Sequence, residues 1–467
     1  MFEAKVMWVI QEGIISVRIT QIVAEYGPRM KIIVIGAGLA GLTAAHRLQQ
    51  AGLSVNVFER EQSPGGRMAE AHDVGLNYLT GARLIYSFSK SVMGLIRELD
   101  LTDQLCHGLT IPVSTCSLAG EHSVQISPGP QLLFNSPLSY NQRLRLLQMG
   151  VGVAGRRFST NPDRLLDWQH YDEGTLYEFL KQRSLDQASQ IYIEPIFRGA
   201  RGWRMTDVSP VFFLSTTAHM YGSHAYTFTD GIGLLTERLA QNLDVTYCAD
   251  VKNVSRAASG GSELSYESKG LLHSTHTDLV ICAVPGSLSL SIVSQPTAEE
   301  SQFFRRVKYS SGYIVHFGID RSVEPSVRFF SRDVNPSIAA VEIVDQSRIP
   351  SSYLSRLSVY LSPEAVIERK SQPVVDGELP AIWNDLPDDV ARHLDLGYGH
   401  MVRQRIKNML PLFYPGYLKE LSAFESYQMR GKKQIYYAGD FMSHALLGGA
   451  CRSGEDVAQA IISDWAD

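Results

Sequence analysis

Cysteine is scarce in this sequence. The chain of 467 residues contains five cysteines, Cys106, Cys116, Cys248, Cys282 and Cys451, and no two of them form a Cys-x-x-Cys pair. A disulfide framework or a thiolate zinc site would need closely and regularly spaced cysteines. The spacing therefore excludes both, predicts that the protein has no metal site, and favours reduced thiols in an intracellular protein.

Long hydrophobic runs and an excess of positive charge are also missing. No stretch approaches the roughly 20 apolar residues that cross a bilayer. Lys and Arg number 43 against 48 Asp and Glu, a net charge of -5, whereas nucleic-acid binders carry the opposite bias. We therefore predict a cytoplasmic protein that acts on a small molecule and has no nucleic-acid partner. A homodimer and a peripheral contact with a membrane remain open.

Glycine is abundant where the first clear strand ends. The stretch VIGAGLAGLTAAHRLQQAGLSVNVFEREQSPGGRM spans residues 34–68. The pattern of apolar and β-branched residues predicts a buried strand over Lys31–Ile35, a helix over Leu39–Gln50 and a second strand over Leu53–Phe58. An acidic residue follows the glycines after about 20 positions, which is typical of a dinucleotide-binding βαβ unit.

Each glycine of this turn has a separate physical role. Gly36 permits the tight turn, Gly38 lets the backbone approach a pyrophosphate, and Gly41 lets the helix pack closely on the strand. The helix begins at Leu39 and Ala40, so its N-terminus faces the phosphates with a partial positive charge. We predict that these five residues bind the phosphates of a dinucleotide.

The end of the second strand indicates which dinucleotide is bound. Glu59, followed by Arg60, would accept hydrogen bonds from the adenosine ribose and would repel a 2′-phosphate, which speaks against NADP. A plain NAD site has no use for the second glycine pair, Gly65 and Gly66, or for Arg67 beside it. A longer dinucleotide does, because the glycines allow close approach and Arg67 can neutralise phosphates.

The order GxGxxG, acidic residue, GGR resembles the amino-terminal signature of the flavin-containing amine oxidoreductases. These include monoamine and polyamine oxidases, protoporphyrinogen oxidases and carotenoid desaturases. The resemblance implies FAD and an α/β fold: a Rossmann-type FAD-binding domain built from three separated segments, with an interleaved mixed α+β substrate domain. Cys451 is the cysteine nearest the expected flavin, but the family's covalent linkage sits in another motif context, so we predict non-covalent FAD.

Later stretches match the same family plan. After GGR, Asn77 and Tyr78 follow a glycine in the loop that the family places on the flavin face. In TFTDGIGLLTERLAQNLDVTYCADVKNVSR, Val251 matches the position whose backbone holds the adenine. In TDLVICAVPGSLS, Ala283 and Pro285 match an AxP motif beside the cofactor. The resemblance therefore assigns all five residues to the FAD site.

The carboxyl-terminal stretch QIYYAGDFMSHALLGGACRSGEDVAQAII carries the third match. A strand over Ile435–Ala438 ends in Gly439 and Asp440, which resemble the pair that contacts the FAD diphosphate and ribityl chain. A helix beginning near Gly449 would direct its N-terminus at the flavin ring, where its dipole favours negative charge on the reduced flavin. Arg452 stands where the family has small or apolar residues. It is either a substrate or flavin contact, or a solvated helix residue.

The two stretches between these matches would form the substrate domain. In EPIFRGARGWRMTD, Arg198, Arg201 and Arg204 surround Trp203. This segment is either a solvated loop with one aromatic anchor, or a substrate wall whose cations bind an anionic group. On the second reading, Arg201 and Trp203 contact the substrate.

The strand expected over Gly312–Ile319, with alternating polarity, resembles the one on which amine oxidases place a lysine close to the flavin. Here Ser311, Gly312 and Tyr313 occupy that place, and Lys308 comes too early. The missing lysine weakens an amine oxidase interpretation. No catalytic residue is identified by the sequence.

The predicted organisation alternates between the two domains. Residues 1–29 are interrupted by charges, fit no secretory signal, and are expected to be an appendage whose removal leaves cofactor binding intact. The FAD-binding domain is expected from residues 30–114, 227–295 and 411–467, and the substrate domain from residues 115–226 and 296–410.

These features predict an FAD-dependent oxidoreductase. The layout LDWQHYDEGTLYEFL, EPIFRGARGW, TDVSP most resembles protoporphyrinogen oxidase-like and desaturase-like members. We therefore expect hydride removal from a bulky, conjugated or lipophilic substrate, with oxygen or another electron acceptor. The alternatives are an amine oxidase, a non-redox flavin-dependent isomerase, and a protein that retains FAD only structurally.

Overall fold

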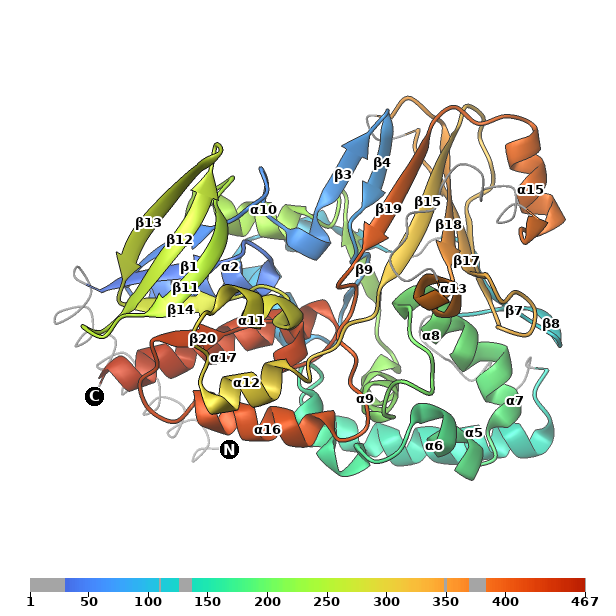
Figure 1. Cartoon of the computed structure of the whole chain (residues 1–467). Coiled ribbons are helices and arrows are strands. Elements are labelled where there is room, and N and C mark those ends of the chain that lie inside the picture. Colours follow the sequence, from blue (N-terminus) through green and yellow to red (C-terminus); the bar gives the residue numbers. More distant parts are fainter. Residues whose placement is uncertain (1–29, 109–110, 126–136, 348–350, 369–383, 467) are drawn as a thin grey trace.

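The computed structural model describes residues 30–108, 111–125, 137–347, 351–368 and 384–466. The predicted appendage, residues 1–29, lies outside the described residues. Figure 1 shows a parallel sheet with its helices on one side of the molecule, and a large mixed sheet above a layer of helices on the other.

A five-stranded parallel sheet forms the first part of the molecule. Its strand order is β10–β2–β1–β14–β20, and all its neighbours pair in parallel. The strands are β1 (Lys31–Ile35), β2 (Ser54–Phe58), β10 (Asp244–Thr246), β14 (Leu279–Cys282) and β20 (Ile435–Tyr437). They come from three separated parts of the chain, and the predicted fold class is confirmed.

Helices cover this sheet closely. They are α2 (Leu39–Gln50), α3 (Lys90–Glu98), α10 (Leu234–Gln241) and α17 (Leu447–Ala466). Helix α17 packs on α2 through Gly454, where an added Cβ would lie 2.3 Å from the Ala40 carbonyl oxygen. The predicted bounds of β1 and α2 are confirmed, while α17 begins two residues before the expected Gly449. An antiparallel sheet of β11 (Asp250–Arg256), β12 (Ser262–Ser268) and β13 (Leu271–Thr277) follows β10.

A seven-stranded mixed sheet forms the second part, with the order β19–β15–β18–β17–β16–β7–β8. Its strands are β7 (Val113–Ser117), β8 (Gly120–Ser123), β15 (Gly312–Ile319), β16 (Ser326–Phe330), β17 (Ile338–Asp345), β18 (Ser355–Leu361) and β19 (Met401–Ile406). Strands β7 and β16 pair in parallel, although the residues joined, such as Val113 and Val327, lie far apart in sequence.

Strand β15 has the predicted bounds but not the predicted contrast between its faces. All eight of its residues are buried, so the alternation of polarity does not become an alternation of burial. One face packs with α15 (Asp388–Asp395) through Val390 and Leu394. The other face holds His316, whose ring stacks on Tyr78 at 4.7 Å.

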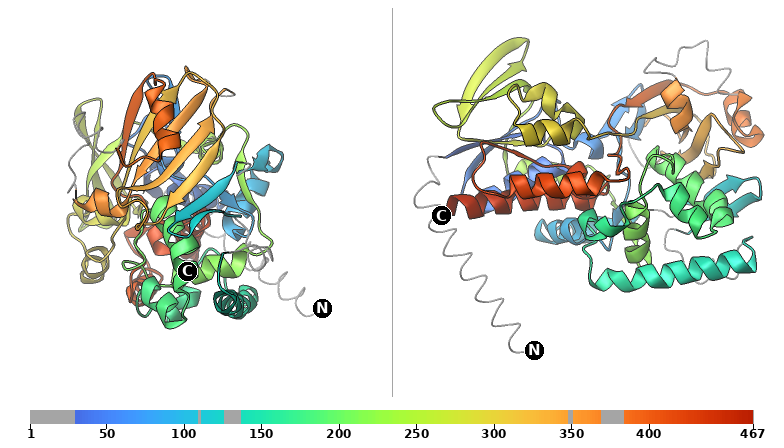
Figure 2. Two further views of the ribbon diagram at one scale, coloured as in Figure 1. Left: turned by 90° about the vertical axis from the view of Figure 1, so that its right-hand side faces the viewer. Right: turned by 60° about the horizontal axis from the view of Figure 1, so that its bottom comes forward.

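Helices lie beneath the mixed sheet, and Figure 2 shows α5 as the long helix along the lower edge in its right-hand view. The main ones are α5 (Tyr140–Ala154), α6 (Leu176–Gln182), α8 (Glu194–Arg201) and α9 (Val211–Met220). Helix α8 approaches the sheet at Gly199, where an added Cβ would lie 2.4 Å from the Phe329 ring.

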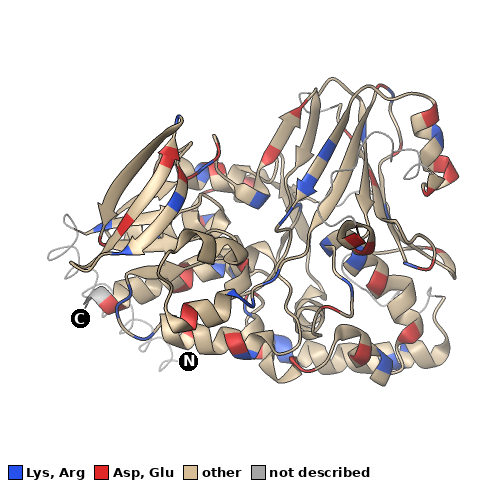
Figure 3. Cartoon of the chain, in the orientation of Figure 1, with Lys and Arg blue, Asp and Glu red and all other residues tan. Residues whose placement is uncertain are grey.

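Several shorter elements complete the two parts. They are β3 (Glu70–Asp73), β4 (Leu76–Leu79), β5 (Ile85–Tyr86), β6 (Leu105–His107), β9 (Ala225–Phe228), α7 (Asp186–Ala188), α11 (Ser289–Ile292), α12 (Ala298–Phe304), α13 (Pro363–Glu368) and α16 (Tyr417–Gln428). Figure 3 shows basic and acidic residues interspersed along the ribbon of both parts. Within the described ranges, no helix combines the length and apolarity that a bilayer crossing requires.

Candidate active site

A cavity of about 2410 Å³ lies between the carboxyl ends of the parallel strands and the mixed sheet. Ligand pockets usually measure about 300–1,000 Å³, so this one has room for a large cofactor and a second molecule. Most of the predicted site residues line it: Gly36, Gly38, Leu39, Ala40, Glu59, Arg60, Gly66, Arg67, Tyr78, Arg201, Val251, Ala283, Pro285, Gly439 and Asp440.

The first glycine turn is shaped for a ligand on one side and for packing on the other. Gly36 has a φ of +105°, a conformation that favours glycine. An added Cβ at Gly38 would meet no protein atom within 4 Å, whereas at Gly41 it would lie 2.1 Å from the Gly36 carbonyl oxygen. Gly38 is therefore open to the cavity, and Gly41 holds α2 against the strand without lining the cavity.

The N-terminus of α2 has no side-chain cap. Gly38 is the N-cap residue and supplies no side chain to accept from the first helical amides. Those amides therefore need an outside acceptor, and together with the helix dipole they favour an anion such as a diphosphate.

Glu59 is buried at the end of β2 and held by two backbone amides. Its carboxylate accepts hydrogen bonds from the Ala37 N–H at 2.7 Å and from the Glu61 N–H at 3.0 Å. Each carboxylate oxygen has a further lone pair, so Glu59 can still accept from ribose hydroxyls. Arg60 beside it is exposed and pairs with Glu61 at 3.0 Å.

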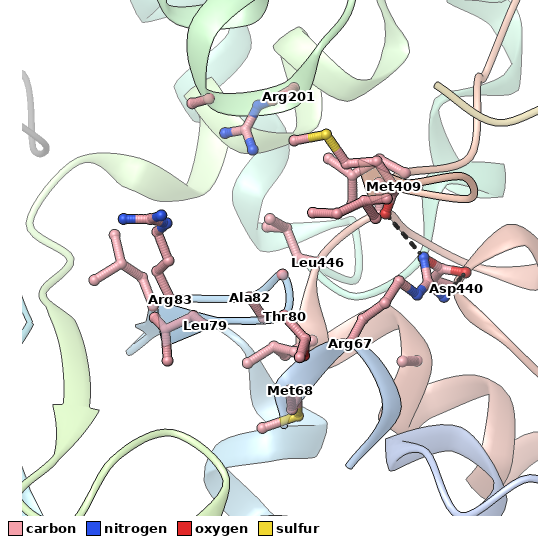
Figure 4. Close-up of a pocket in the computed structure, with 18 of the residues that line it drawn as sticks. Arg67, Met68, Leu79, Thr80, Ala82, Arg83, Arg201, Met409, Asp440 and Leu446 are labelled. Atoms are coloured by element: carbon pink, nitrogen blue, oxygen red, sulfur yellow. Dashed lines mark hydrogen bonds and ion pairs between the residues drawn. The ribbon is translucent and has the colours of Figure 1, made fainter. Parts of the chain in front are cut away.

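Arg67 forms a bidentate pair rather than facing the cavity as a free cation. Its guanidinium donates to the two Asp440 carboxylate oxygens at 2.6 and 2.9 Å, and to the Met409 carbonyl oxygen at 3.1 Å. Burial lowers the pKa of Arg67, but the Asp440 carboxylate more than offsets this and the pKa is raised. Arg67 therefore links the GGR loop to the end of β20, and its contact with FAD phosphates stays a prediction. Figure 4 shows this pair at one side of the cavity.

Tyr309 completes this link and was not foreseen from the sequence. Its hydroxyl accepts from the Gly286 N–H at 3.1 Å and donates to Asp440 at 3.4 Å, and its ring lies 5.6 Å below the Arg67 guanidinium. Burial raises the pKa of Tyr309 well above its ordinary value, so the hydroxyl remains a donor.

Four predicted residues do not line the cavity. Gly41 packs as described. The carbonyl of Asn77 accepts from Gln346 at 2.7 Å. Trp203 is buried in the core with its ring edge-on to Phe212 at 4.9 Å. Arg452 pairs with Asp456 one helical turn away at 2.8 Å. The structure therefore gives Trp203 and Arg452 no place on a substrate wall, because one fills the core and the other is neutralised on its own helix.

An apolar wall comes from the helices beneath the mixed sheet. It includes Leu146, Met149, Ile196, Phe213 and Met220, from α5, α8 and α9. None of these was predicted as a site residue. A helix that lines a cavity and one that packs in a core share the same apolar period, so the sequence carried no distinguishing signal.

A polar cluster lies on the mixed sheet at another part of the wall. Glu342 of β17 pairs with Arg83 and with Arg356 of β18, and it accepts from the Tyr360 hydroxyl at 3.1 Å. His316 lies beside this cluster, and burial together with Arg356 lowers its pKa to about 3. Sequence reasoning missed these residues, although a single charge inside the apolar strand AAVEIVD was a signal that could have found Glu342.

Comparison with known proteins agrees with this geometry. The family model described as flavin containing amine oxidoreductase matches residues 39–462. A mitochondrial protoporphyrinogen oxidase from Nicotiana tabacum is 38% identical over 80 residues, which are 17% of this chain and 16% of that protein. The matched regions cover about a third or less of the curated relatives' length.

Solved structures of similar fold cover nearly the whole chain. Cyclohexylamine oxidase from Brevibacterium oxydans has a TM-score of 0.67 at 16% identity, covering 93% of this chain and 99% of its own. The CLA-producing fatty acid isomerase from P. acnes has a TM-score of 0.64 at 15% identity, covering 92% and 98%. The fold is shared at these identities, and the family model spans most of the sequence. The chain therefore belongs to the flavin-containing amine oxidoreductase family.

Proposed function

We propose that the protein binds FAD non-covalently and uses it to oxidise a bulky, lipophilic organic substrate. The observation that carries the proposal is one cavity that joins an open, uncapped dinucleotide turn at the carboxyl edge of the parallel sheet to an apolar wall from three helices. The first part suits the cofactor and the second suits a substrate with a large apolar surface.

The cofactor would lie along the predicted FAD residues. The α2 amides and Gly38 would face the diphosphate, and Glu59 would face the ribose. Gly439 would line the cavity at the other end of the parallel sheet's edge. Cys451 is buried off the cavity wall, where Thr43 donates to its sulfur at 3.7 Å, and burial raises the pKa of its thiol. A neutral, enclosed thiol is a poor nucleophile, which supports non-covalent binding.

When bound, the flavin supplies the redox chemistry by accepting a hydride. The chain's own residues hold the substrate against it and exclude water. The apolar wall of α5, α8 and α9 would bury the body of the substrate. We assign no side chain as an acid or base.

Anaerobic bleaching of the flavin absorbance tests the proposal. A porphyrinogen, an acyclic carotene and a polyamine would each be added to the purified, oxygen-free holoenzyme, with dithionite as the control that the flavin can be reduced. We expect the porphyrinogen or the carotene to bleach the flavin. Bleaching by the polyamine alone would contradict the lipophilic substrate.

Two alternatives keep a specific supporting observation. Lys407, the residue that follows β19, lines the cavity and could serve an amine oxidase, although Ser311, Gly312 and Tyr313 stand where such an enzyme would place its lysine. The fold similarity to a fatty acid isomerase supports a reaction without net redox change. An isomerase would turn over under nitrogen with no electron acceptor, whereas an oxidase would stop after one turnover.

We also propose a peripheral contact with anionic membranes through α5. Tyr140, Leu144, Leu147 and Val151 recur at helical spacing and are all exposed. Residues 137–162 contain four arginines and no Asp or Glu. Exposed apolar residues beside basic ones are the features that hold a helix in the interface of an anionic bilayer. Leu147 and Val151 also line the cavity. Contact of α5 with a membrane would therefore place the cavity beside lipophilic substrates dissolved in that membrane.

Sedimentation with vesicles tests the contact. Holoenzyme would be mixed with vesicles of phosphatidylcholine alone or with phosphatidylserine added, and the bound fraction measured. We expect binding to the anionic vesicles that weakens with salt and falls about 10-fold in Leu144→Glu. Leu272→Glu, at an exposed apolar position on β13, is the matched control. Equal binding of the two variants would contradict the role of α5.

A further inference from the structure

The side chains of the three arginines around Trp203 have different partners in the structure. Arg198 is buried, donates to the Phe330, Pro336 and Ile338 carbonyl oxygens, and pairs with Glu364 at 3.1 Å. Arg204 is half-exposed and pairs with Asp207 at 2.7 Å. Arg201 pairs with no carboxylate among the described residues. Of the three arginines, it is the one that lines the cavity.

The surroundings of Arg201 are mainly aromatic. Its guanidinium lies 4.6 Å from the centre of the Phe212 ring and 6.0 Å from that of Phe197, and its Nε is buried with no hydrogen-bond partner. Burial lowers the pKa of Arg201, while a hydrogen bond with the Tyr86 hydroxyl raises it. Arginine nevertheless stays protonated in proteins, so a positive charge without a carboxylate partner remains in the cavity wall.

The position of Arg201 is fixed by its backbone. It is the last residue of α8, and Gly202 ends the helix with a φ of +61°. The Ser310 hydroxyl donates to the Arg201 carbonyl oxygen at 3.1 Å. Figure 4 shows the Arg201 guanidinium above Leu446 and Arg83, on the side of the cavity away from Arg67 and Met68.

Other arginines of the cavity wall have carboxylate partners. Arg83 and Arg356 both pair with Glu342, and Arg67 pairs with Asp440. An unpaired cation in a partly apolar wall is costly unless a counter-charge reaches it. Arg201 lies against the apolar surface of α8 and α9 without a carboxylate partner among the described residues, so an anionic ligand would complement it.

We propose that the ligand of this cavity is a lipophilic carboxylate, with its carboxylate bound by Arg201 and its apolar body against α5, α8 and α9. The inference rests on the proposed function, because it assigns a substrate class to the same cavity. A guanidinium can bind a carboxylate with two parallel hydrogen bonds. A neutral lipophile such as a carotene would leave the charge of Arg201 unpaired.

Fluorescence titration of the holoenzyme with cis-parinaric acid, a conjugated fatty acid, and with its methyl ester tests the proposal. The acid is expected to bind the unaltered protein more tightly than the ester. Arg201→Met should weaken the acid about 10- to 100-fold and leave the ester within about twofold. Arg201→Lys should retain part of the affinity, because it keeps the charge without the planar fork.

Arg204→Met is the matched control, because it removes a neighbouring arginine that pairs on the surface, and it should change neither affinity. Equal binding of acid and ester by the unaltered protein, or an equal loss of both in Arg201→Met, would overturn the proposal. The acid–ester comparison does not depend on the folding of any variant. Flavin content is measured separately, so a protein without flavin would refute the proposed function while the preference for the acid still tests Arg201.

Discussion

Gly38 and Gly41 stand three residues apart in one motif, yet the structure separates their roles. At Gly38 the backbone is extended, with φ of -79° and ψ of 172°, and an added methyl group would meet open space. At Gly41 the same group would collide with backbone. A ligand role and a packing role can therefore be distinguished with one pair of variants.

We expect Gly38→Ala to lower the flavin content while changing the unfolding free energy of the flavin-free protein by no more than about 1 kcal/mol. Gly41→Ala should destabilise the flavin-free protein by about 1–3 kcal/mol, because helix and strand must move apart. Absorbance gives flavin per chain and urea unfolding gives stability. Full flavin content in Gly38→Ala would show that nothing approaches this backbone.

We expect His316 to make the stability depend on pH. It is buried, bonded to the Ser358 hydroxyl at 2.9 Å and to Gln404 at 3.1 Å, and burial lowers its pKa to about 3. The ordinary pKa of histidine is about 6.5, so as pH falls below that value the unfolded chain gains a proton that the folded chain does not. The contribution of His316 to stability is therefore complete above about pH 6.5 and is lost toward pH 3.

The expected loss from His316 is about 1.4 kcal/mol for each pH unit below 6.5. His316→Asn should remove this dependence, so that its unfolding free energy falls less steeply than that of the unaltered protein between pH 6 and pH 4.5. Urea unfolding at several pH values measures both slopes. Identical slopes would mean that His316 titrates normally in the folded protein.

Single residues also show what the sequence could and could not supply. Gly36, Gly38 and Glu59 were predictable because a local turn and one strand end define their roles. The contact of Arg83 with Glu342 was not predictable, because it joins positions far apart in the chain, even though the charge within AAVEIVD marks Glu342 itself. The role of Trp203 was left open between an anchor and a substrate contact, because an aromatic residue among arginines has the same pattern in a core as in a binding wall.

The GGR loop and the end of β20 are joined by the Arg67–Asp440 pair. Side-chain exposure is 32% for Arg67 and 7% for Asp440, so the carboxylate is enclosed while the guanidinium is partly solvated. The pair connects two of the three segments that build the cavity edge. Its removal should therefore affect cofactor retention as well as stability.

A double-mutant cycle with Arg67→Met and Asp440→Asn should give a coupling free energy of about 1–3 kcal/mol, and each single variant should lose flavin. Arg67→Lys should have a stability and a flavin content between those of the unaltered protein and Arg67→Met, because it keeps the charge but loses the bidentate geometry. Urea unfolding and flavin absorbance are measured on all variants. Coupling below about 0.5 kcal/mol would mean that the two segments are held together by other contacts.

Elements close to the motifs were predicted well, and distant pairings were not. The bounds of β1, α2 and β15 follow from local patterns of polarity and glycine. The order of the mixed sheet, in which β7 pairs in parallel with β16, depends on tertiary packing that no short stretch encodes. The burial of both faces of β15 likewise arises because α15 covers one side and Tyr78 the other.

The molecule as a whole places a dinucleotide turn and an apolar wall around one space. The α/β class was predictable because three separated stretches each carry a βα turn or a strand end of the same family plan. The cavity itself was not, since its walls come from helices whose sequences resemble ordinary core. The boundaries of the two domains stay a prediction.

Identification of the cofactor tests the central claim most directly. The purified full chain would be denatured by heat, and the supernatant separated by chromatography against FAD and FMN. We predict about one FAD per chain in the supernatant, a colourless pellet, and much less FAD from Gly38→Ala. A chain that releases FMN, releases no flavin, or retains the yellow colour in the pellet would contradict non-covalent FAD in this cavity.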